Sequence, residues 1–172
     1  MERTGAGKTS GFSAHPAARR TPGLLRDILL TGAGAALASA AVTASVARYE
    51  GKGALQPLNA TSHWLHGEAA GRVRRLDGSH SGVGIATHVL SALFWAAPYA
   101  LWVRSAPDRS PGEIVGGAAA TALVAAAVDY GAMPRRLSPG WELALDRPGI
   151  AATFVGLGLG LAGGALVARG FD

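Results

Sequence analysis

The sequence contains no cysteine and only two lysines. The absence of thiols excludes disulfides, thiolate metal sites and cysteine nucleophiles. Charge is scarce as well: Asp, Glu, Lys and Arg make up 16% of the 172 residues, and they occur in clusters between long uncharged intervals. A soluble domain instead carries charge along each amphipathic element. The pattern therefore argues against an ordinary soluble protein and favours a membrane protein.

The few charges that are present have a net value of +5. The basic residues flank apolar segments and form no stripe along a predicted helix, so we expect no nucleic-acid partner. Basic flanks are typical of segments that end at a lipid surface, and the expected partner is the lipid bilayer. Abundant Arg, Ala and Gly indicate a GC-rich bacterial genome, and hence the bacterial inner membrane.

Four apolar runs are long enough to cross the hydrocarbon core of a bilayer, which requires about 20 residues. We expect transmembrane helices at about 28–47, 81–103, 114–133 and 149–168. The third run is the weakest, because its uncharged part is short and the helix must continue through Asp129 to span fully. The predicted fold class is an all-α membrane protein, a four-transmembrane-helix bundle formed by residues 23–172.

Residues 1–22 are rich in Gly, Ser, Thr, Pro and Arg and show no apolar periodicity, which predicts a disordered tail. The Lys and Arg counts of the loops on the two sides are equal. We place the N-terminus in the cytoplasm because Arg19, Arg20 and Arg26 precede the first helix. An even number of helices then places the C-terminus there too. Aromatic residues at the predicted boundaries agree with these spans; they are Tyr49, Trp102, Tyr130 and Trp141.

Small residues repeat every four positions on the first and last predicted helices, which lets two backbones approach closely. The residues are Gly32 and Ala36 on the first helix, and Gly156, Gly160 and Gly164 on the last. We expect these two helices to pack against each other. The same faces could instead bind a second copy of the chain or a larger membrane partner.

The loop between the first two helices contains a short segment that Pro57 is suited to start as a helix. In such a helix Asn59, His63 and His66 lie on one face. Trp64 and its apolar neighbours would enter the membrane boundary, which predicts a short amphipathic helix on the surface. The alternative is a simple surface anchor with solvated histidines.

His88 lies about two turns inside the second predicted helix, where an ionisable side chain is costly and often functional. The alternative is a neutral imidazole that hydrogen-bonds Ser91, Thr87 or a neighbouring helix. Asp129, at the end of the third helix, has two interpretations of the same kind. One is a proton-binding carboxylate, and the favoured one is an ion pair with Arg135 or Arg136.

Topology places the first and third loops on one side of the membrane. The candidate polar residues that this side brings together are Asn59, His63, His66, His80, His88, Asp129, Tyr130, Arg136 and Glu142. The opposite side has only the tails and a short loop at residues 104–113. We therefore expect any site at the side of the first and third loops.

Two stretches of the chain carry a resemblance. Residues 57–63 read P-L-N-A-T-S-H, and residues 129–142 read D-Y-G-A-M-P-R-R-L-S-P-G-W-E. They resemble a group of small bacterial inner-membrane proteins that share P-x-N-A-x-S-H and D-Y-x-x-x-P-x-R-L-x-P-G-x-E. The resemblance implies a four-helix inner-membrane protein and brings no established activity, substrate or cofactor.

Four functions stay open. The first is a structural or accessory protein that packs through its glycine faces. The second is a small transporter or proton relay through His88, Asp129 and His63. The third is a histidine-based metal or haem protein. The fourth is a membrane enzyme with His63 as base, oriented by Asp129 or Glu142. The first is favoured, with no enzyme activity, cofactor or metal expected.

Overall fold

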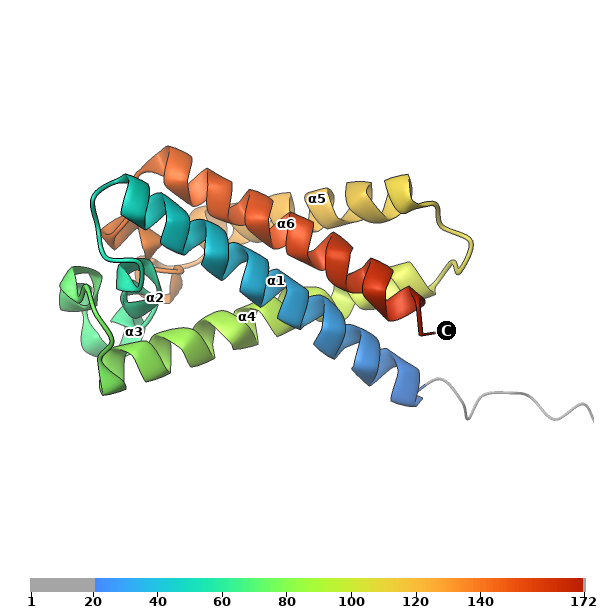
Figure 1. The fold of residues 1–172 in the computed structure, drawn as a ribbon, viewed down its shortest axis with the longest axis horizontal. Coiled ribbons are helices and arrows are strands. Elements are labelled where there is room, and N and C mark those ends of the chain that lie inside the picture. Colours follow the sequence, from blue (N-terminus) through green and yellow to red (C-terminus); the bar gives the residue numbers. More distant parts are fainter. Residues whose placement is uncertain (1–20, 172) are drawn as a thin grey trace, which may run out of the picture.

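Four long helices form the framework of the molecule (Figure 1). The computed structural model describes residues 21–171 of the chain. The long helices are α1 (Thr21–Tyr49), α4 (Gly78–Arg104), α5 (Pro111–Ala127) and α6 (Arg147–Arg169). A π-helical turn, η2 (Val128–Ala132), continues α5. No strand occurs among the described residues.

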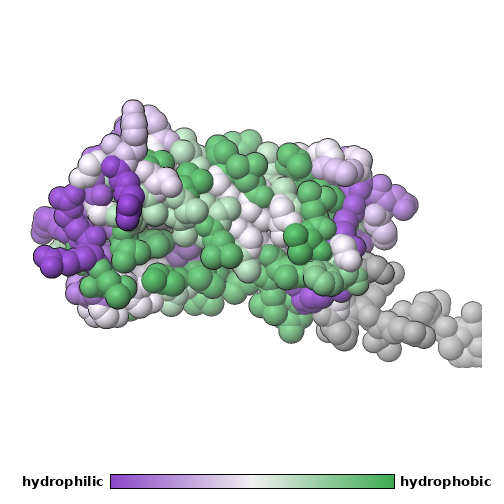
Figure 2. Space-filling view, in the orientation of Figure 1, coloured by the Kyte–Doolittle hydropathy of each residue, from purple (hydrophilic) through white to green (hydrophobic). Residues whose placement is uncertain are grey.

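Each framework helix, with η2 counted as part of α5, is long and apolar enough to cross a membrane. Figure 2 shows that the middle of the visible face is mostly apolar, with hydrophilic residues gathered at both ends. Large apolar side chains of the long helices are exposed, among them Leu37, Leu123 and Phe94, each about two-thirds exposed or more. Such a surface is suited to lipid rather than to water. The predicted fold class, an all-α four-helix membrane protein, is confirmed.

The two ends of the bundle differ in their connections. At the long-loop end, residues 50–77 join α1 to α4, and residues 133–146 join η2 to α6. The first of these loops contains α2 (Gln56–Ala60), α3 (His63–His66) and η1 (Glu68–Arg72), and the second contains η3 (Arg135–Leu137) and η4 (Trp141–Leu143). At the short-loop end, residues 105–110 join α4 to α5, and the start of α1 lies near the end of α6 (Figure 1).

Glycines bring α1 and α6 into close contact along their length (Figure 1). A Cβ atom on Gly160 would lie 2.6 Å from the Cα of Ala35, and one on Gly164 would lie 2.6 Å from the carbonyl oxygen of Leu30. On α1 the residue that meets Gly160 is Gly34. Gly32 lies instead against Leu93 of α4, and the Ala36 carbonyl also faces α4 through His88. The first and last helices therefore pack together as expected, and the predicted stripe of α6 faces α1. On α1, however, Gly32 of the predicted stripe packs on α4, because residues two positions apart on a helix face different neighbours.

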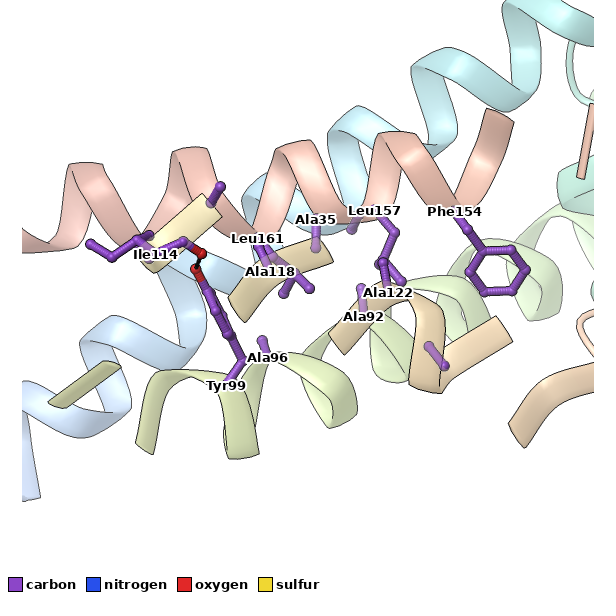
Figure 3. Packing of buried hydrophobic residues seen from close by; sticks show 14 of the residues in the cluster. Ala35, Ala92, Ala96, Tyr99, Ile114, Ala118, Ala122, Phe154, Leu157 and Leu161 are labelled. Atoms are coloured by element: carbon purple, nitrogen blue, oxygen red, sulfur yellow. Dashed lines mark hydrogen bonds between the residues drawn. The ribbon is translucent and has the colours of Figure 1, made fainter. Parts of the chain in front are cut away.

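The interior between the four helices is built mainly from small and aliphatic side chains, with Tyr99, Trp141 and Phe154 as its aromatic members (Figure 3). Ala92 and Ala96 of α4 lie opposite Ala118 and Ala122 of α5, with Leu157 and Leu161 of α6 in the same cluster. The hydroxyl of Tyr99 donates a 2.8 Å hydrogen bond to the Ile114 carbonyl and so links α4 to α5. Small side chains permit close helix packing, as is common in membranes.

The observed first helix starts at Thr21, earlier than the predicted residue 28. Its first two turns contain the charged residues Arg26 and Asp27, which form an ion pair. Thr21 and Pro22 already belong to α1. The predicted disordered tail otherwise falls on residues 1–20, which lie outside the described residues. The third span extends to Ala132 through its π-helical turn, close to the predicted end at residue 133.

Candidate functional site

A row of polar side chains is buried along α1. Its members are Asp27, Thr31, Ser39 and Thr43, each 6% exposed or less. Ser39 meets His88 of α4, and Thr43 donates a 3.1 Å hydrogen bond to Thr153 of α6. The sequence prediction missed this row. Its signal was the spacing of 4, 8 and 4 residues, which follows one i, i+4 ridge that winds slowly around the helix.

His88 lies inside the bundle, 7% exposed, between α4 and α1. Its Nε2 is 3.1 Å from the Ala36 carbonyl oxygen and 3.2 Å from the Ser39 hydroxyl. A carbonyl oxygen only accepts hydrogen bonds, so Nε2 carries a hydrogen. In the neutral ring Nδ1 is then an acceptor, and it has no hydrogen bond among the described residues.

Asp129 lies on the π-helical turn η2 at the end of the third span. Within the described part of the chain its carboxylate has no ion pair or hydrogen bond. The favoured prediction of a pair with Arg135 or Arg136 is therefore wrong. The Arg136 side chain donates to the Trp64 carbonyl at 3.2 Å instead. An unpaired carboxylate within a membrane span is uncommon, because an ionised group there is costly.

His88 and Asp129 line the same cavity, which has a volume of about 240 Å³. We call it the His88–Asp129 pocket. Its wall contains four aromatic rings and five hydroxyl groups; these are Trp64, Trp95, Trp141 and Phe154, and Ser39, Thr61, Thr87, Ser91 and Ser138. No lysine or arginine of residues 21–171 lines it. Trp141 buries its Nε1 donor with no partner in this region of the structure, although a buried Trp N–H is normally paired.

Two of the predicted site residues, Asn59 and His63, form hydrogen bonds that hold the first loop in place, and they do not line the pocket. Asn59 is fully buried and donates to the carbonyls of Val73 (2.9 Å) and Arg75 (3.0 Å) while accepting from Ser81 (2.6 Å). The ring nitrogens of His63 lie 3.2 Å from the Ala60 carbonyl oxygen and 3.0 Å from that of Arg135.

The predicted short helix of this loop is divided into α2 and α3, and its polar face points into the protein. Asn59 and His63 are buried, which contradicts the alternative of solvated histidines. The prediction of His63 as a base oriented by Asp129 or Glu142 is also wrong, because both of its nitrogens face backbone carbonyls.

His66 and His80 lie together, with ring centroids 4.4 Å apart, away from the pocket. Asp77 caps α4 by accepting the backbone N–H groups of Ser79 and His80, and it also contacts the His80 ring at 2.8 Å. These bonds, led by the backbone N–H of His80, hold the pKa of Asp77 well below its usual range. Among the described residues no group of three or more His, Asp or Glu is placed to hold a metal ion.

Tyr130 and Glu142 lie next to the pocket and are linked to its wall by hydrogen bonds. Tyr130 donates to one carboxylate oxygen of Glu142 at 3.1 Å, and Ser138, which lines the pocket, donates to the other at 2.6 Å. Trp141, predicted at the membrane boundary, is instead 6% exposed and packs against Phe154. The aromatic wall therefore comes from the third loop as well as from the helices.

A second and larger cavity, about 560 Å³, lies at the short-loop end. It is lined by Asp27, Arg104 and Arg169 together with aliphatic residues. The sequence predicted any site at the side of the first and third loops, but a cavity with charged residues in its wall also lies at the opposite end. That prediction considered only loops, whereas these charged side chains belong to the ends of helices.

Together, the fold and these two cavities, each with polar groups in a mostly apolar wall, define a polytopic four-helix membrane protein. No family model matches the chain, and neither a curated protein nor a solved structure matches it.

Proposed function

We propose that the protein binds a small protonated amine in the His88–Asp129 pocket. The observation that carries this proposal is the unpaired carboxylate of Asp129 in an aromatic cavity that no basic side chain of the described residues lines. A carboxylate in such surroundings attracts a cation, because little water competes for it. The aromatic faces of Trp64, Trp95 and Trp141 add cation–π attraction.

The hydrogen-bonding groups narrow the ligand further. Asp129 and the Nδ1 atom of His88 are both acceptors, which suits a ligand that carries N–H donors rather than a quaternary ammonium. Most of the wall is apolar or aromatic, so the rest of the ligand is hydrocarbon. A volume of about 240 Å³ lies below the range of about 300–1,000 Å³ typical of drug-sized ligands, and favours a small molecule.

This proposal develops the sequence alternative of a small transporter that uses His88 and Asp129. It leaves out the relay step through His63, because that side chain braces the loop. A purely structural or accessory role does not account for an unpaired acid in a cavity. Location in a bacterial inner membrane, with both termini in the cytoplasm, stays part of the proposal, supported by composition and by the basic residues before α1.

Tryptophan fluorescence of the purified protein tests binding. The chain has four tryptophans, and replacing Trp102, which stacks on Arg109 away from the pocket, by Phe leaves the three that line it. We expect cyclohexylmethylamine to change this fluorescence saturably, and its neutral isostere cyclohexylmethanol to have a much weaker effect. Asp129→Asn should raise the apparent Kd about tenfold, the loss expected for one charge-assisted hydrogen bond.

Asp108→Asn is the matched control, because it removes an exposed acid from the short loop at the other end. It should leave the apparent Kd unchanged. Equal binding of the amine and the alcohol, or unchanged affinity in the Asp129→Asn protein, would overturn the proposal.

A further inference from the structure

The cavity at the short-loop end differs in chemistry from the His88–Asp129 pocket. It is lined by residues from the start of α1, the end of α4, the short loop and the end of α6. Most of its wall is aliphatic, and its charged residues are one acid, Asp27, and two arginines, Arg104 and Arg169. We call it the Arg104–Arg169 pocket. Its lining therefore has one more positive than negative charge.

The positive charges of this pocket are unequally compensated. Arg104 pairs with Asp27, which is 6% exposed and also accepts from Arg26 at 2.9 Å. Arg169 donates to the backbone carbonyls of Arg109 (2.6 Å) and Pro107 (3.0 Å). No carboxylate of residues 21–171 forms an ion pair with it, and Glu113 acts on its charge only through a minor Coulombic interaction. Its guanidinium is thus oriented by the short loop, and its charge is only partly offset, which suits an anion.

A buried hydroxyl supplies an independent observation. Thr31 lines the same cavity one helical turn deeper than Asp27, is 1% exposed, and its Oγ1 has no hydrogen-bond partner in the described structure. Threonine in a helix normally donates to the carbonyl four residues before it. A buried polar atom without a partner is costly, which indicates a ligand that supplies an acceptor or donor there.

We propose that the Arg104–Arg169 pocket binds an anionic amphiphile, with a phosphate group at Arg169 and Arg104 and a hydrocarbon portion along the aliphatic wall. Guanidinium groups bind phosphate oxygens through paired N–H donors. A basic pocket between membrane helices is suited to a lipid headgroup. The volume of about 560 Å³ is large enough for a headgroup and the first part of a chain but not for a whole phospholipid.

Thermal unfolding of the purified protein in a neutral detergent tests this inference. We expect a short-chain phosphatidylglycerol to raise the Tm saturably, and a phosphatidylcholine with the same chains to have little effect. Inorganic phosphate is the third probe. Weaker stabilisation by phosphate identifies the lipid as the source of the anion, whereas stabilisation equal to that by phosphatidylglycerol identifies free phosphate.

Arg169→Gln should weaken the apparent Kd for phosphatidylglycerol about tenfold, and Arg169→Lys should recover part of the loss. The matched control is Arg147→Gln, which removes an exposed arginine from the other end of α6. Its Kd should equal that of the wild type.

Equal stabilisation by phosphatidylcholine and phosphatidylglycerol would overturn the inference, and so would an unchanged Kd in the Arg169→Gln protein. Should that variant fail to fold, the salt dependence of the wild-type protein decides. An ionic contact weakens between low and high salt, and a Kd independent of salt would equally exclude a phosphate site. These outcomes do not depend on whether the His88–Asp129 pocket binds an amine.

Discussion

The two ends of the bundle each contain a pocket, and the net charge of the lining differs in sign between the two pockets. At the long-loop end, an acid and aromatic rings surround a small pocket that two long loops help to close. At the short-loop end, arginines and aliphatic side chains surround a larger pocket with almost no loop. Helix α1 contributes to both, through Ser39 at one end and Thr31 at the other. The close contact between Gly34 and Gly160 lies between these two positions. The two pockets therefore lie on either side of this close contact, one with two long loops in its wall and one without.

The largest expected effect comes from breaking this central contact. In Gly160→Leu the new Cβ would meet Ala35 Cα at 2.6 Å and also clash with the Gly34 carbonyl. We expect a loss of about 3 kcal/mol or more in the free energy of unfolding, because neither backbone can give way without moving a helix. Both ends should be disturbed, which thermal unfolding and the labelling of single cysteines introduced at each end will show.

Gly163→Leu is the control for that substitution. It lies on the same helix, and within the described structure nothing is within 4 Å of its added Cβ. It should unfold at nearly the wild-type temperature. Equal losses in the two variants would contradict the role of close α1–α6 packing.

A second variant should disturb the long-loop end alone. Asn59→Ala removes three hydrogen bonds that join α2 to the chain before α4 and to Ser81. The buried carbonyl and hydroxyl groups then lack hydrogen-bond partners, which should lower the free energy of unfolding by about 2–3 kcal/mol. Hydrogen exchange should rise in residues 53–77 and stay unchanged in residues 105–110. Ser45→Ala, which removes an exposed hydroxyl bonded to its own helix, is the control. Uniform exchange at both ends would show that they are coupled.

Two glycines of the long-loop end separate backbone strain from steric contact. Gly140 and Gly51 have φ angles of +77° and +72°, so alanine at either should cost about 1 kcal/mol from the left-handed backbone. At Gly140 a Cβ would in addition lie 2.5 Å from the Ala60 carbonyl and crowd the His63 ring. At Gly51 nothing described lies within 4 Å. Thermal unfolding should show a clearly larger loss for Gly140→Ala, and equal losses would contradict the close contact of the third loop with His63.

The smallest effect concerns pH and the start of α4. The pKa of Asp77 lies well below its ordinary value of 3.8 in the folded protein. Its stabilisation is therefore complete at neutral pH and declines only as the pH falls below about that ordinary value. Asp77→Asn keeps a capping side chain without the charge. The difference in Tm between the wild type and this variant should shrink from pH 5 to pH 2.5, and a difference that grows on acidification would contradict the assignment.

Much of the candidate site was predictable one residue at a time. His88 and Asp129 were identified because ionisable groups inside apolar runs are costly wherever the helices lie. The hydroxyl groups of the polar row of α1 gave a weaker signal. Burying a hydroxyl group in a membrane helix costs little free energy, so these residues do not stand out in an apolar run. Asn59 and His63 were grouped with the site from their helical spacing. Their inward orientation depends on contacts with residues 73, 75 and 135, which a local pattern does not contain.

The sequence by itself determined the four membrane spans and the all-α class, because a bilayer requires a long apolar run and satisfies the backbone only within a helix. The tertiary structure alone decided which helix faces meet. Gly34 rather than Gly32 lies opposite Gly160, and Asp27 pairs with Arg104 across the bundle. Among the described residues, Asp129 forms no ion pair with an arginine. The physical reason is that crossing the membrane is a property of each helix. Helix rotation and crossing are settled only by close contact between helices.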